Sequence, residues 1–190
     1  MGHPGKPGKF EGSFMFLLRH GQSYFNLHFT ATKRDPGIED PELTELGHQQ
    51  ARAAAQALQG AGITRVIVSP YTRALQTAEP FLALPGVTAE VLHEVRERTA
   101  FVCDIGSPPA LLATRFPHHE FGHLPARWWH EETESEAATE ERARAFRAAM
   151  AAREDHASTL LVSHWGFLLA LTGRSVANGE WLEYDPAEGF

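Results

Sequence analysis

The sequence predicts an α/β fold, a three-layer α/β/α sandwich with a mostly parallel central sheet and helices on both faces. Short apolar and β-branched runs, typical of buried strands, alternate along the chain with longer stretches of good helix formers. Three of the apolar runs end in polar residues that could carry chemistry. In sheets built this way, ligands bind outside the carboxyl ends of the strands.

The first strand is predicted at residues 14–19, an apolar run that ends in a charged residue. It leads directly into His20-Gly21-Gln22-Ser23, whose composition is typical of a tight loop. A helix is then predicted from its capping residue Thr44 to Leu58, because apolar and alanine positions recur between them and two glycines follow.

The second strand is predicted at residues 65–69, a β-branched run that Pro70 ends. A helical stretch from Thr72 towards Glu79 follows it, and residues 87–92 form the next plausible strand. This order of strand, loop and helix is the repeating unit of a parallel sheet.

The last predicted helix spans residues 135–153, which are rich in alanine and charged side chains. It leads into an apolar strand at residues 159–163, which His164 closes. Residues 106–130 contain four prolines and are predicted to be rich in loops.

The length of 190 residues and the hydrophobic content of 43% predict one globular domain at residues 14–190, preceded by a flexible tail at residues 1–13. The net charge of -7 argues against nucleic acid or an anionic membrane as the main partner. Cys103 is the single cysteine and cannot form an internal disulfide, so the cytoplasm is the expected location. Neither a membrane-spanning run nor the apolar core of a signal peptide is expected.

The predicted strand ends bring together two histidines and two arginines, namely Arg19, His20, Arg73 and His164. Arginine binds phosphate oxygens bidentately and keeps its charge, so this set resembles a phosphate site that needs no metal. Gly21 would let the backbone approach the anion, and a helix that starts just after it would aim free N–H groups at the same point.

The chemistry that fits such a site is attack of a neutral imidazole on phosphorus to form a covalent intermediate that water then hydrolyses. The leaving alkoxide needs a proton, so a carboxylic acid is expected nearby. Glu94 and Glu97 follow the strand predicted at residues 87–92 and are the two candidates.

Four ordered motifs between positions 19 and 166 resemble those of the histidine phosphatase superfamily, in its phosphoglycerate mutase-like branch, and they imply that family's fold. The motifs are Arg19-His20-Gly21-Gln22-Ser23 with Asn26, Leu43-Thr44-Glu45-Leu46-Gly47 with Gln50-Ala51, Ser69-Pro70 with Arg73-Ala74 and Gln76-Thr77-Ala78, and Ser163-His164-Trp165-Gly166. Gln22 stands where the family usually has glutamate.

The resemblance implies that His20 is the nucleophile and that His164 is a second catalytic histidine that contacts the phosphoryl group. It assigns the phosphate-binding residues Arg19, Gly21, Gln22, Asn26 and Arg73. Glu97 is the preferred acid, because a subgroup carries a similar Arg-Glu shortly before Cys-Asp-x-Gly, and Glu94 is the alternative.

The implied function is hydrolysis of a small phosphate ester without a metal or other cofactor, by a protein that could form a homodimer. Two alternatives are a phosphoglycerate mutase, which returns the phosphoryl group to its substrate, and a catalytically weak module that binds phosphoproteins. His119-Glu120-Phe121-Gly122-His123 matches a zinc-protease pattern. Pro117, Gly122 and Pro125 disfavour the helix that this pattern requires, so we expect a solvated loop instead.

Overall fold

The computed structural model describes residues 14–188, and the tail predicted at residues 1–13 lies outside the described residues. Its five-stranded sheet has the order β3-β2-β4-β1-β5. The strands are β1 Met15–Arg19, β2 Arg65–Val68, β3 Thr88–Val91, β4 Thr159–Ser163 and β5 Trp181–Tyr184. Strands β1 to β4 pair in parallel, and β5 joins the edge next to β1 antiparallel. The predicted mostly parallel sheet is therefore confirmed.

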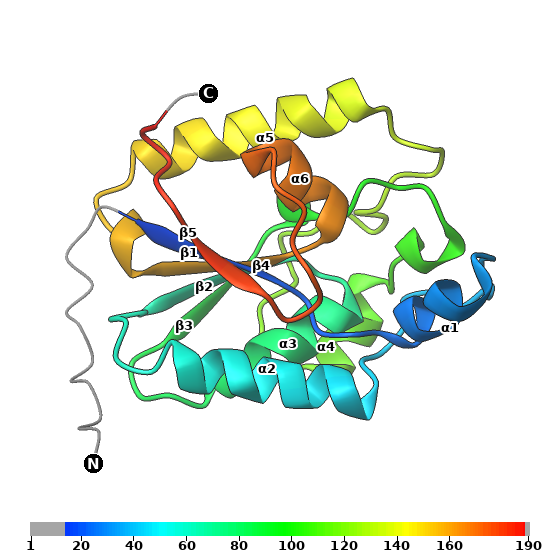
Figure 1. Cartoon of the computed structure of the whole chain (residues 1–190), viewed down its shortest axis with the longest axis horizontal. Coiled ribbons are helices and arrows are strands. Elements are labelled where there is room, and N and C mark those ends of the chain that lie inside the picture. Colours follow the sequence, from blue (N-terminus) through cyan, green and yellow to red (C-terminus); the bar gives the residue numbers. More distant parts are fainter. Residues whose placement is uncertain (1–13, 189–190) are drawn as a thin grey trace, which may run out of the picture.

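Helices cover both faces of this sheet, as Figure 1 shows. The α-helices are α1 Tyr24–Thr32, α2 Glu45–Ala57, α3 Thr72–Leu82, α4 Pro109–Arg115, α5 Glu136–Ala151 and α6 Trp165–Thr172. Short 3-10 helices lie at His93–Val95, Val102–Asp104 and His156–Ser158. Helices α2, α3 and α4 pack on one face and α5 and α6 on the other, while α1 lies beyond the carboxyl ends of the strands. The three-layer sandwich is confirmed.

The core divides into two layers because successive residues of a strand point to opposite faces of the sheet. In β1, Phe16 and Leu18 pack with α2 and α3, whereas Met15 and Leu17 pack with α5 and α6. Strands buried on both sides explain why their sequences read as continuous apolar runs rather than alternating ones. None of the helices within residues 14–188 is both long enough and apolar enough to span a bilayer.

The predicted helix starts are found in the structure with their caps. Thr44 Oγ1 accepts from the Gly47 N–H at 3.1 Å, and Ser135 Oγ accepts from the Ala138 N–H at 3.2 Å. The segment 106–130, predicted to be loop-rich, contains the helix α4 as well as turns. This helix was missed because Pro108 and Pro109 read as loop residues, although proline is favoured in the first turn of a helix.

Trp128 belongs to the core, as the commoner fate of large aromatic residues predicts. Its ring meets that of Tyr71 at a centroid distance of 4.7 Å, and its indole N–H donates to the Ser107 carbonyl at 2.9 Å. Cys103 is also buried, and burial raises the pKa of its thiol, so it is not an activated nucleophile.

Gly21 and Gly47 allow the loop after β1 to lie directly against α2. A Cβ atom on Gly21 would meet the Gly47 carbonyl oxygen at 2.4 Å, and one on Gly47 would meet the Gln22 carbonyl oxygen at 2.1 Å. A close approach of the backbone therefore occurs at Gly21, where it brings the loop against α2. This contact fixes the position of the loop that carries His20.

Gly47→Ala is expected to destabilise the protein by about 1–3 kcal/mol, the range for overpacking a filled site. In an open helix position the same substitution would stabilise by about 1 kcal/mol, so the sign separates the two situations. Urea unfolding measures the effect. Gln49→Ala, at an exposed position of the same helix, is the control and should change stability by less than about 0.5 kcal/mol. A Gly47→Ala protein as stable as the control would contradict the contact.

Candidate active site

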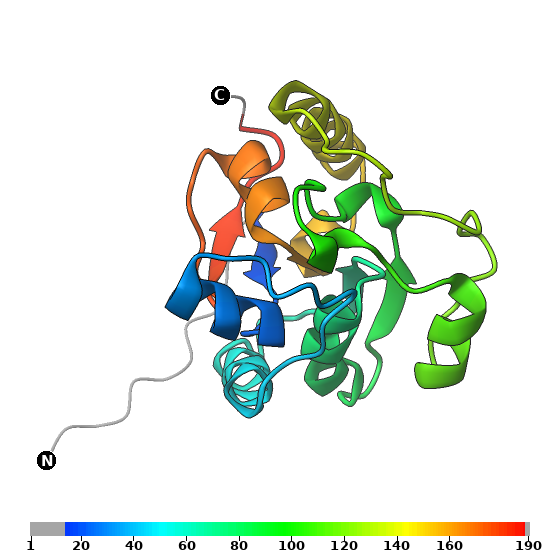
Figure 2. The same ribbon diagram turned by 90° about the vertical axis from the view of Figure 1, so that its right-hand side faces the viewer.

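The carboxyl ends of three neighbouring strands bring three of the four sequence motifs to one place. Arg19 pairs with Ser163 across β1 and β4, and Val68 pairs with Val162 across β2 and β4. The His20 N–H donates to the Ser163 carbonyl at 3.0 Å, which extends the pairing beyond the strands. Figure 2 views the molecule from this side, with α1 in front of the strand ends.

A cavity of about 300 Å³ opens at this edge and is lined by five of the predicted site residues. These are Arg19, His20, Asn26, Arg73 and Glu97. Within residues 14–188, the lining does not include Gly21, Gln22, Glu94 or His164. The structure thus brings the predicted nucleophile, both arginines and the preferred acid together.

His20 is buried, and its ring is held in one tautomer. Its Nδ1 lies 2.7 Å from the Gly21 carbonyl oxygen, which can only accept, so Nδ1 carries the proton and Nε2 has a free lone pair. Burial lowers the pKa of His20 well below its usual value, and the charges of Arg73 and Arg19 lower it further. His20 is therefore neutral at neutral pH, as a nucleophile must be.

His164 is fully buried, and its ring centroid lies 5.1 Å from that of His20. Its Nε2 lies 2.7 Å from the Ser69 hydroxyl, whereas its buried Nδ1 has no hydrogen-bond partner in the described part of the chain. A buried nitrogen without a partner costs free energy unless a ligand satisfies it. Burial, followed by the charge of Arg73, lowers the pKa of His164 well below its usual value.

Arg73 is held rigidly by the protein before any substrate binds. Its guanidinium donates to the Cys103 carbonyl at 2.8 Å and to Asp104 at 3.2 Å, and it lies 4.2 Å from the centre of the Tyr71 ring. Arg19 donates from Nη1 to the Val176 carbonyl at 2.9 Å, and its Nε has no partner within residues 14–188. Both guanidinium groups also line the cavity.

Glu97 is the acid candidate that the geometry selects. Its carboxyl accepts from the Gly166 N–H at 2.9 Å and from the Arg98 N–H at 2.8 Å. Burial raises the pKa of Glu97, and the nearby Asp104 raises it further, which keeps more of the group protonated near neutral pH. Glu94 is exposed and paired with His93 at 3.5 Å, away from the cavity.

A buried ion cluster supports the segment that carries Glu97. Arg142 on α5 donates to the Glu94 carbonyl at 2.6 Å and to the Arg96 carbonyl at 3.2 Å, and it pairs with Glu134 at 2.6 Å. The Glu134 N–H donates to the Thr99 carbonyl at 2.9 Å. Arg142 on α5 therefore holds the segment before Glu97, and Glu134, which precedes α5, holds the segment after it.

Two of the predicted phosphate-binding elements make contacts within the protein in this structure. The side chain of Gln22 accepts from the Thr44 hydroxyl at 2.9 Å, at the start of α2. The N–H groups of Tyr24 and Asn26 were expected to face the anion, but they donate to the Glu42 carbonyl and to the Ser23 hydroxyl. Helix α1 begins where it was expected. In its capping box, the Ser23 side chain accepts from the Asn26 N–H and the Asn26 side chain accepts from the Ser23 N–H.

Three residues that the sequence analysis did not single out hold the site together. Asp104 pairs with Arg73, Thr77 accepts from the Gly21 N–H at 3.0 Å, and Asn178 donates to the His20 carbonyl at 3.1 Å. Asp104 and Thr77 lie within motifs used for the resemblance, so a signal existed for them. Asn178 comes from a distant loop, and no local pattern marks it.

Asp40 is a fourth such residue, and it caps α3 from outside that helix. Its carboxylate accepts from the Thr72 N–H at 2.8 Å, from the Thr72 hydroxyl at 2.7 Å and from the Ser107 hydroxyl at 2.6 Å. Its φ of 38° is a left-handed conformation that aspartate tolerates better than most residues. Since α3 carries Arg73, this cap also helps to position the Arg73 guanidinium at the cavity.

Asp40→Ala is expected to cost about 2–4 kcal/mol of stability, because it leaves buried donors without acceptors and strains the left-handed position. Thermal or urea unfolding measures the loss. Asp40→Asn keeps one acceptor oxygen and the conformational tolerance, so it should lose clearly less than the alanine variant. Equal losses in the two variants would contradict the capping role.

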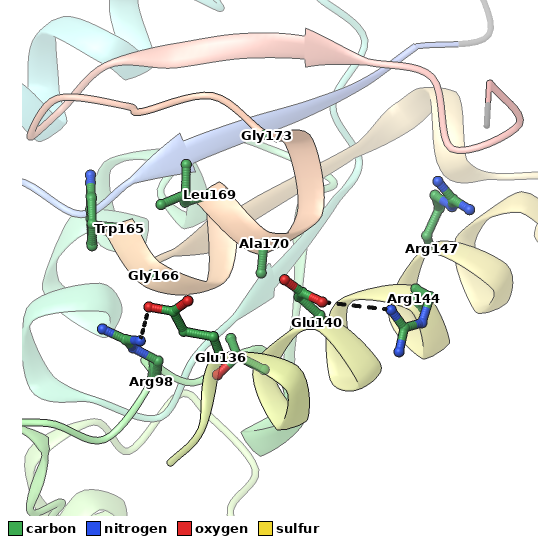
Figure 3. A pocket seen from close by; sticks show the side chains of 11 residues that line it. Arg98, Glu136, Glu140, Arg144, Arg147, Trp165, Gly166, Leu169, Ala170 and Gly173 are labelled. Atoms are coloured by element: carbon green, nitrogen blue, oxygen red, sulfur yellow. Dashed lines mark hydrogen bonds and ion pairs between the residues drawn. The ribbon is translucent and has the colours of Figure 1, made fainter. Parts of the chain in front are cut away.

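A second, larger cavity of about 590 Å³ lies next to the first, between α5 and α6. It shares Arg98, Trp165 and Gly166 with the active-site cavity. Figure 3 shows two ion pairs among its charged side chains. Arg98 pairs with Glu136 at 2.8 Å, and Arg144 pairs with Glu140 at 3.9 Å. It is lined by no histidine among the described residues, so the chemistry is assigned to the smaller cavity.

The segment from His118 to His130 does not form a zinc site. Residues 116–125 are turns and bends, so His119 and His123 do not share the face of a helix as the zinc-protease pattern requires. Within residues 14–188, no group of three or more His, Cys, Asp or Glu side chains could hold a metal ion. The expectation of a solvated loop is only partly right, because His119 is buried and the His123 ring bonds to the Val91 carbonyl.

Comparison with known proteins agrees with this geometry. The family model described as "Histidine phosphatase superfamily (branch 1)" matches residues 15–186. A relative from Photorhabdus laumondii, named probable phosphoglycerate mutase GpmB, is 38% identical over 84 residues, which are 44% of this chain and 36% of the relative. The chain thus matches only about a third of the length of that curated relative.

Solved structures resemble nearly the whole described chain. A mycobacterial glucosyl-3-phosphoglycerate phosphatase in complex with VO3 has a TM-score of 0.63 at 25% identity and covers 90% of each chain. A phosphoserine phosphatase from Entamoeba histolytica has a TM-score of 0.60 at 19% identity, and the match covers 90% of this chain and 89% of that one. At this identity the likeness shows only that the two proteins share a fold. With its four motifs at the carboxyl ends of a parallel sheet and a family match from residue 15 to residue 186, the chain belongs to branch 1 of the histidine phosphatase superfamily.

Proposed function

We propose that this protein hydrolyses small phosphate monoesters through a phosphohistidine on His20 and needs no metal for the reaction. The observation that carries the proposal is the state of His20. Its Nδ1 is fixed on the Gly21 carbonyl, its pKa is depressed, and its ring lines a cavity that also holds two arginines and Glu97. A neutral imidazole in this setting is a competent nucleophile.

In the first step, Nε2 of His20 attacks phosphorus and forms the P–N bond while the P–O bond of the ester breaks. The leaving oxygen takes the proton of the Glu97 carboxyl, so that a neutral alcohol departs. The raised pKa of Glu97 favours this role, because an acid is most effective when its pKa lies close to the working pH.

In the second step, a water molecule attacks the phosphohistidine. The Glu97 carboxylate takes a proton from this water, the P–N bond breaks, and inorganic phosphate leaves. His20 then returns to the neutral form with its lone pair on Nε2, and Glu97 is again protonated. One carboxyl group therefore serves as acid and then as base, as microscopic reversibility requires.

The phosphoryl oxygens would be bound by fixed donors. Arg19 and Arg73 supply two positive charges that offset those of the phosphate without a metal ion. The buried Nδ1 of His164 can donate when its Nε2 accepts from the Ser69 hydroxyl. Asn26 uses its Oδ1 to accept from Ser23 and Asn178, so its Nδ2 is the atom that would face the substrate.

The names of the curated relatives favour one second candidate, a phosphoglycerate mutase. A mutase uses the same histidine chemistry but returns the phosphoryl group to a substrate that also carries a carboxylate. A coupled mutase assay with 2,3-bisphosphoglycerate separates the two. Turnover there that greatly exceeds hydrolysis would replace our proposal with this one.

The direct test uses 4-nitrophenyl phosphate and wild-type protein that has been treated with a chelator. We expect phosphate release that persists without metal, together with a covalent phosphoprotein that is stable in alkali and labile in acid, as a phosphohistidine is. Release that depends on added metal, or a phosphoprotein with the opposite stability, would contradict the mechanism.

A further inference from the structure

Aromatic rings form part of the lining of the active-site cavity. Phe25, Phe29 and Phe101 all line the cavity, and we refer to these three residues as the aromatic cluster. Their ring centroids lie 5.2 Å apart for Phe25 and Phe29, 5.3 Å for Phe25 and Phe101, and 5.1 Å for Phe29 and Phe101. The cavity is therefore lined by a cluster of apolar rings as well as by charged groups.

Asp104 connects the aromatic cluster to Arg73. The backbone N–H groups of Ala100 and Phe101 donate to Asp104 Oδ2 at 2.9 and 3.1 Å, while Asp104 Oδ1 pairs with Arg73 at 3.2 Å. Phe25 and Phe29 come from the other side, four residues apart on α1, where such pairs share a face. The position of the rings relative to the phosphoryl site is thus set by the same groups that hold Arg73.

Part of this apolar surface is open to a ligand. Phe25 is buried, but the Phe101 side chain is 41% exposed at the edge of the cavity. Trp165, which is 38% exposed, lines the same cavity next to Glu97 and Gly166. A flat apolar group placed on the exposed parts of Phe101 and Trp165 would remove apolar surface from water, which is favourable.

The charges around the cavity do not suit a second anionic group on the substrate. Apart from Arg19 and Arg73, the only basic side chain that lines it within residues 14–188 is Arg98, which is paired with Glu136 at 2.8 Å. Glu97 and Asp104 line the same cavity. A carboxylate on the leaving group would lose its hydration here without gaining a free cation.

We infer, on the basis of the proposed function, that the preferred substrates are phosphate monoesters of an uncharged alcohol that carries a flat apolar ring. The phosphoryl group binds between Arg19, Arg73 and His20, and the ring of the leaving group packs on the aromatic cluster. The cluster is a specificity-determining subsite, and it disfavours carboxylated esters such as phosphoglycerate.

The test compares 2-phenylethyl phosphate with ethyl phosphate and with 3-phosphoglycerate. The first two are both primary alkyl esters, so their ratio chiefly reports binding of the ring rather than leaving-group chemistry. We expect kcat/KM to be about 10- to 100-fold higher for the phenyl ester, the range expected for burying one apolar ring. The change should be mainly in KM, and 3-phosphoglycerate should be the poorest of the three.

Variants then assign the preference to the cluster. Phe101→Ala is expected to bring the ratio of kcat/KM for the two alkyl esters close to one, and Phe101→Leu, which keeps apolar surface, should retain part of it. Tyr24→Ala is the matched control, because Tyr24 is an exposed aromatic residue of α1 that does not line the cavity. This control should leave the ratio unchanged.

A binding measurement keeps this inference separate from the proposed function. Calorimetry with 2-phenylethylphosphonate and ethylphosphonate reports the ring subsite even in protein that does not turn over. Tighter binding of the phenyl compound that Phe101→Ala removes supports the subsite whether or not hydrolysis occurs. Equal affinities, or a preference for 3-phosphoglycerate in either assay, would overturn the inference, whereas absence of turnover with any ester would overturn the hydrolase proposal alone.

Discussion

Replacing His20 by alanine is expected to lower kcat for phosphate release by about 10⁴- to 10⁶-fold, the scale observed when a covalent nucleophile is removed. The reason is that no other group can form the P–N bond. His164 is close, but it is fully buried, and its Nε2 is engaged with Ser69. The assay is steady-state phosphate release from 4-nitrophenyl phosphate, with the phosphoprotein trapped in parallel.

The control for this variant is His118→Ala, because His118 is exposed in the loop after α4 and lies outside the cavity. It should retain full activity and form the phosphoprotein. Unfolding curves for both variants exclude a loss of structure as the cause. A His20→Ala protein that keeps even a tenth of the wild-type rate would show that His20 is not the nucleophile.

The sheet and the placement of the motifs were predictable from the sequence because both follow from strong local patterns. The three neighbouring strands β1, β2 and β4 are buried and each reads as a largely apolar run, and they end directly at Arg19, Val68 and Ser163. The carboxyl ends of parallel strands meet at one edge, so the motifs that follow them had to converge.

The elements that were missed have weak or ambiguous patterns. Strand β5 has four residues and lies at an edge of the sheet, where only alternate positions are buried. Helix α6 is a short run of mostly apolar residues, which periodicity alone cannot distinguish from a strand. The end of the chain was therefore left without a predicted element.

The details of the site depend on contacts between distant segments, which no local pattern encodes. The sequence predicted Gln22 and the first N–H groups of α1 as phosphate ligands, and in the structure the Gln22 side-chain oxygen accepts from Thr44, while the N–H groups of Tyr24 and Asn26 donate to Glu42 and Ser23. The choice of Glu97 over Glu94 came from resemblance alone. The structure supplies a physical reason, since Glu97 lines the cavity and Glu94 does not, and burial raises the pKa of Glu97.

Glu97→Gln is expected to have the second largest effect, a loss of about 10²- to 10⁴-fold in kcat/KM with an alkyl phosphate, because kcat/KM reports formation of the phosphoenzyme. The alkoxide that leaves from such an ester is a strong base and needs the proton of Glu97. Glutamine keeps the shape and an acceptor oxygen for the Gly166 N–H, but it has no proton to transfer. With 4-nitrophenyl phosphate the loss in kcat/KM should be much smaller, because nitrophenolate leaves without protonation. The kcat should fall with both esters, because Glu97 also activates the water that hydrolyses the phosphohistidine.

The matched control is Glu94→Gln, which removes the other candidate acid at an exposed position outside the cavity. It should behave as wild type with both esters. A large loss in Glu94→Gln, or a Glu97→Gln loss in kcat/KM that is equal for alkyl and nitrophenyl esters, would reject Glu97 as the proton donor.

The pH profile of the rate also tests Glu97 as the proton donor, since Glu97 determines its alkaline limb and His20 its acidic limb. Glu97 must be protonated, so the rate with an alkyl phosphate should fall as pH rises through its raised pKa. His20 must be neutral, and because its pKa is lowered well below the usual value, its limb lies far on the acidic side. The rate should therefore peak at mildly acidic to neutral pH. In Glu97→Gln the decline on the alkaline side should be lost while the acidic limb stays, and a variant that keeps the wild-type alkaline limb would assign that limb to another group.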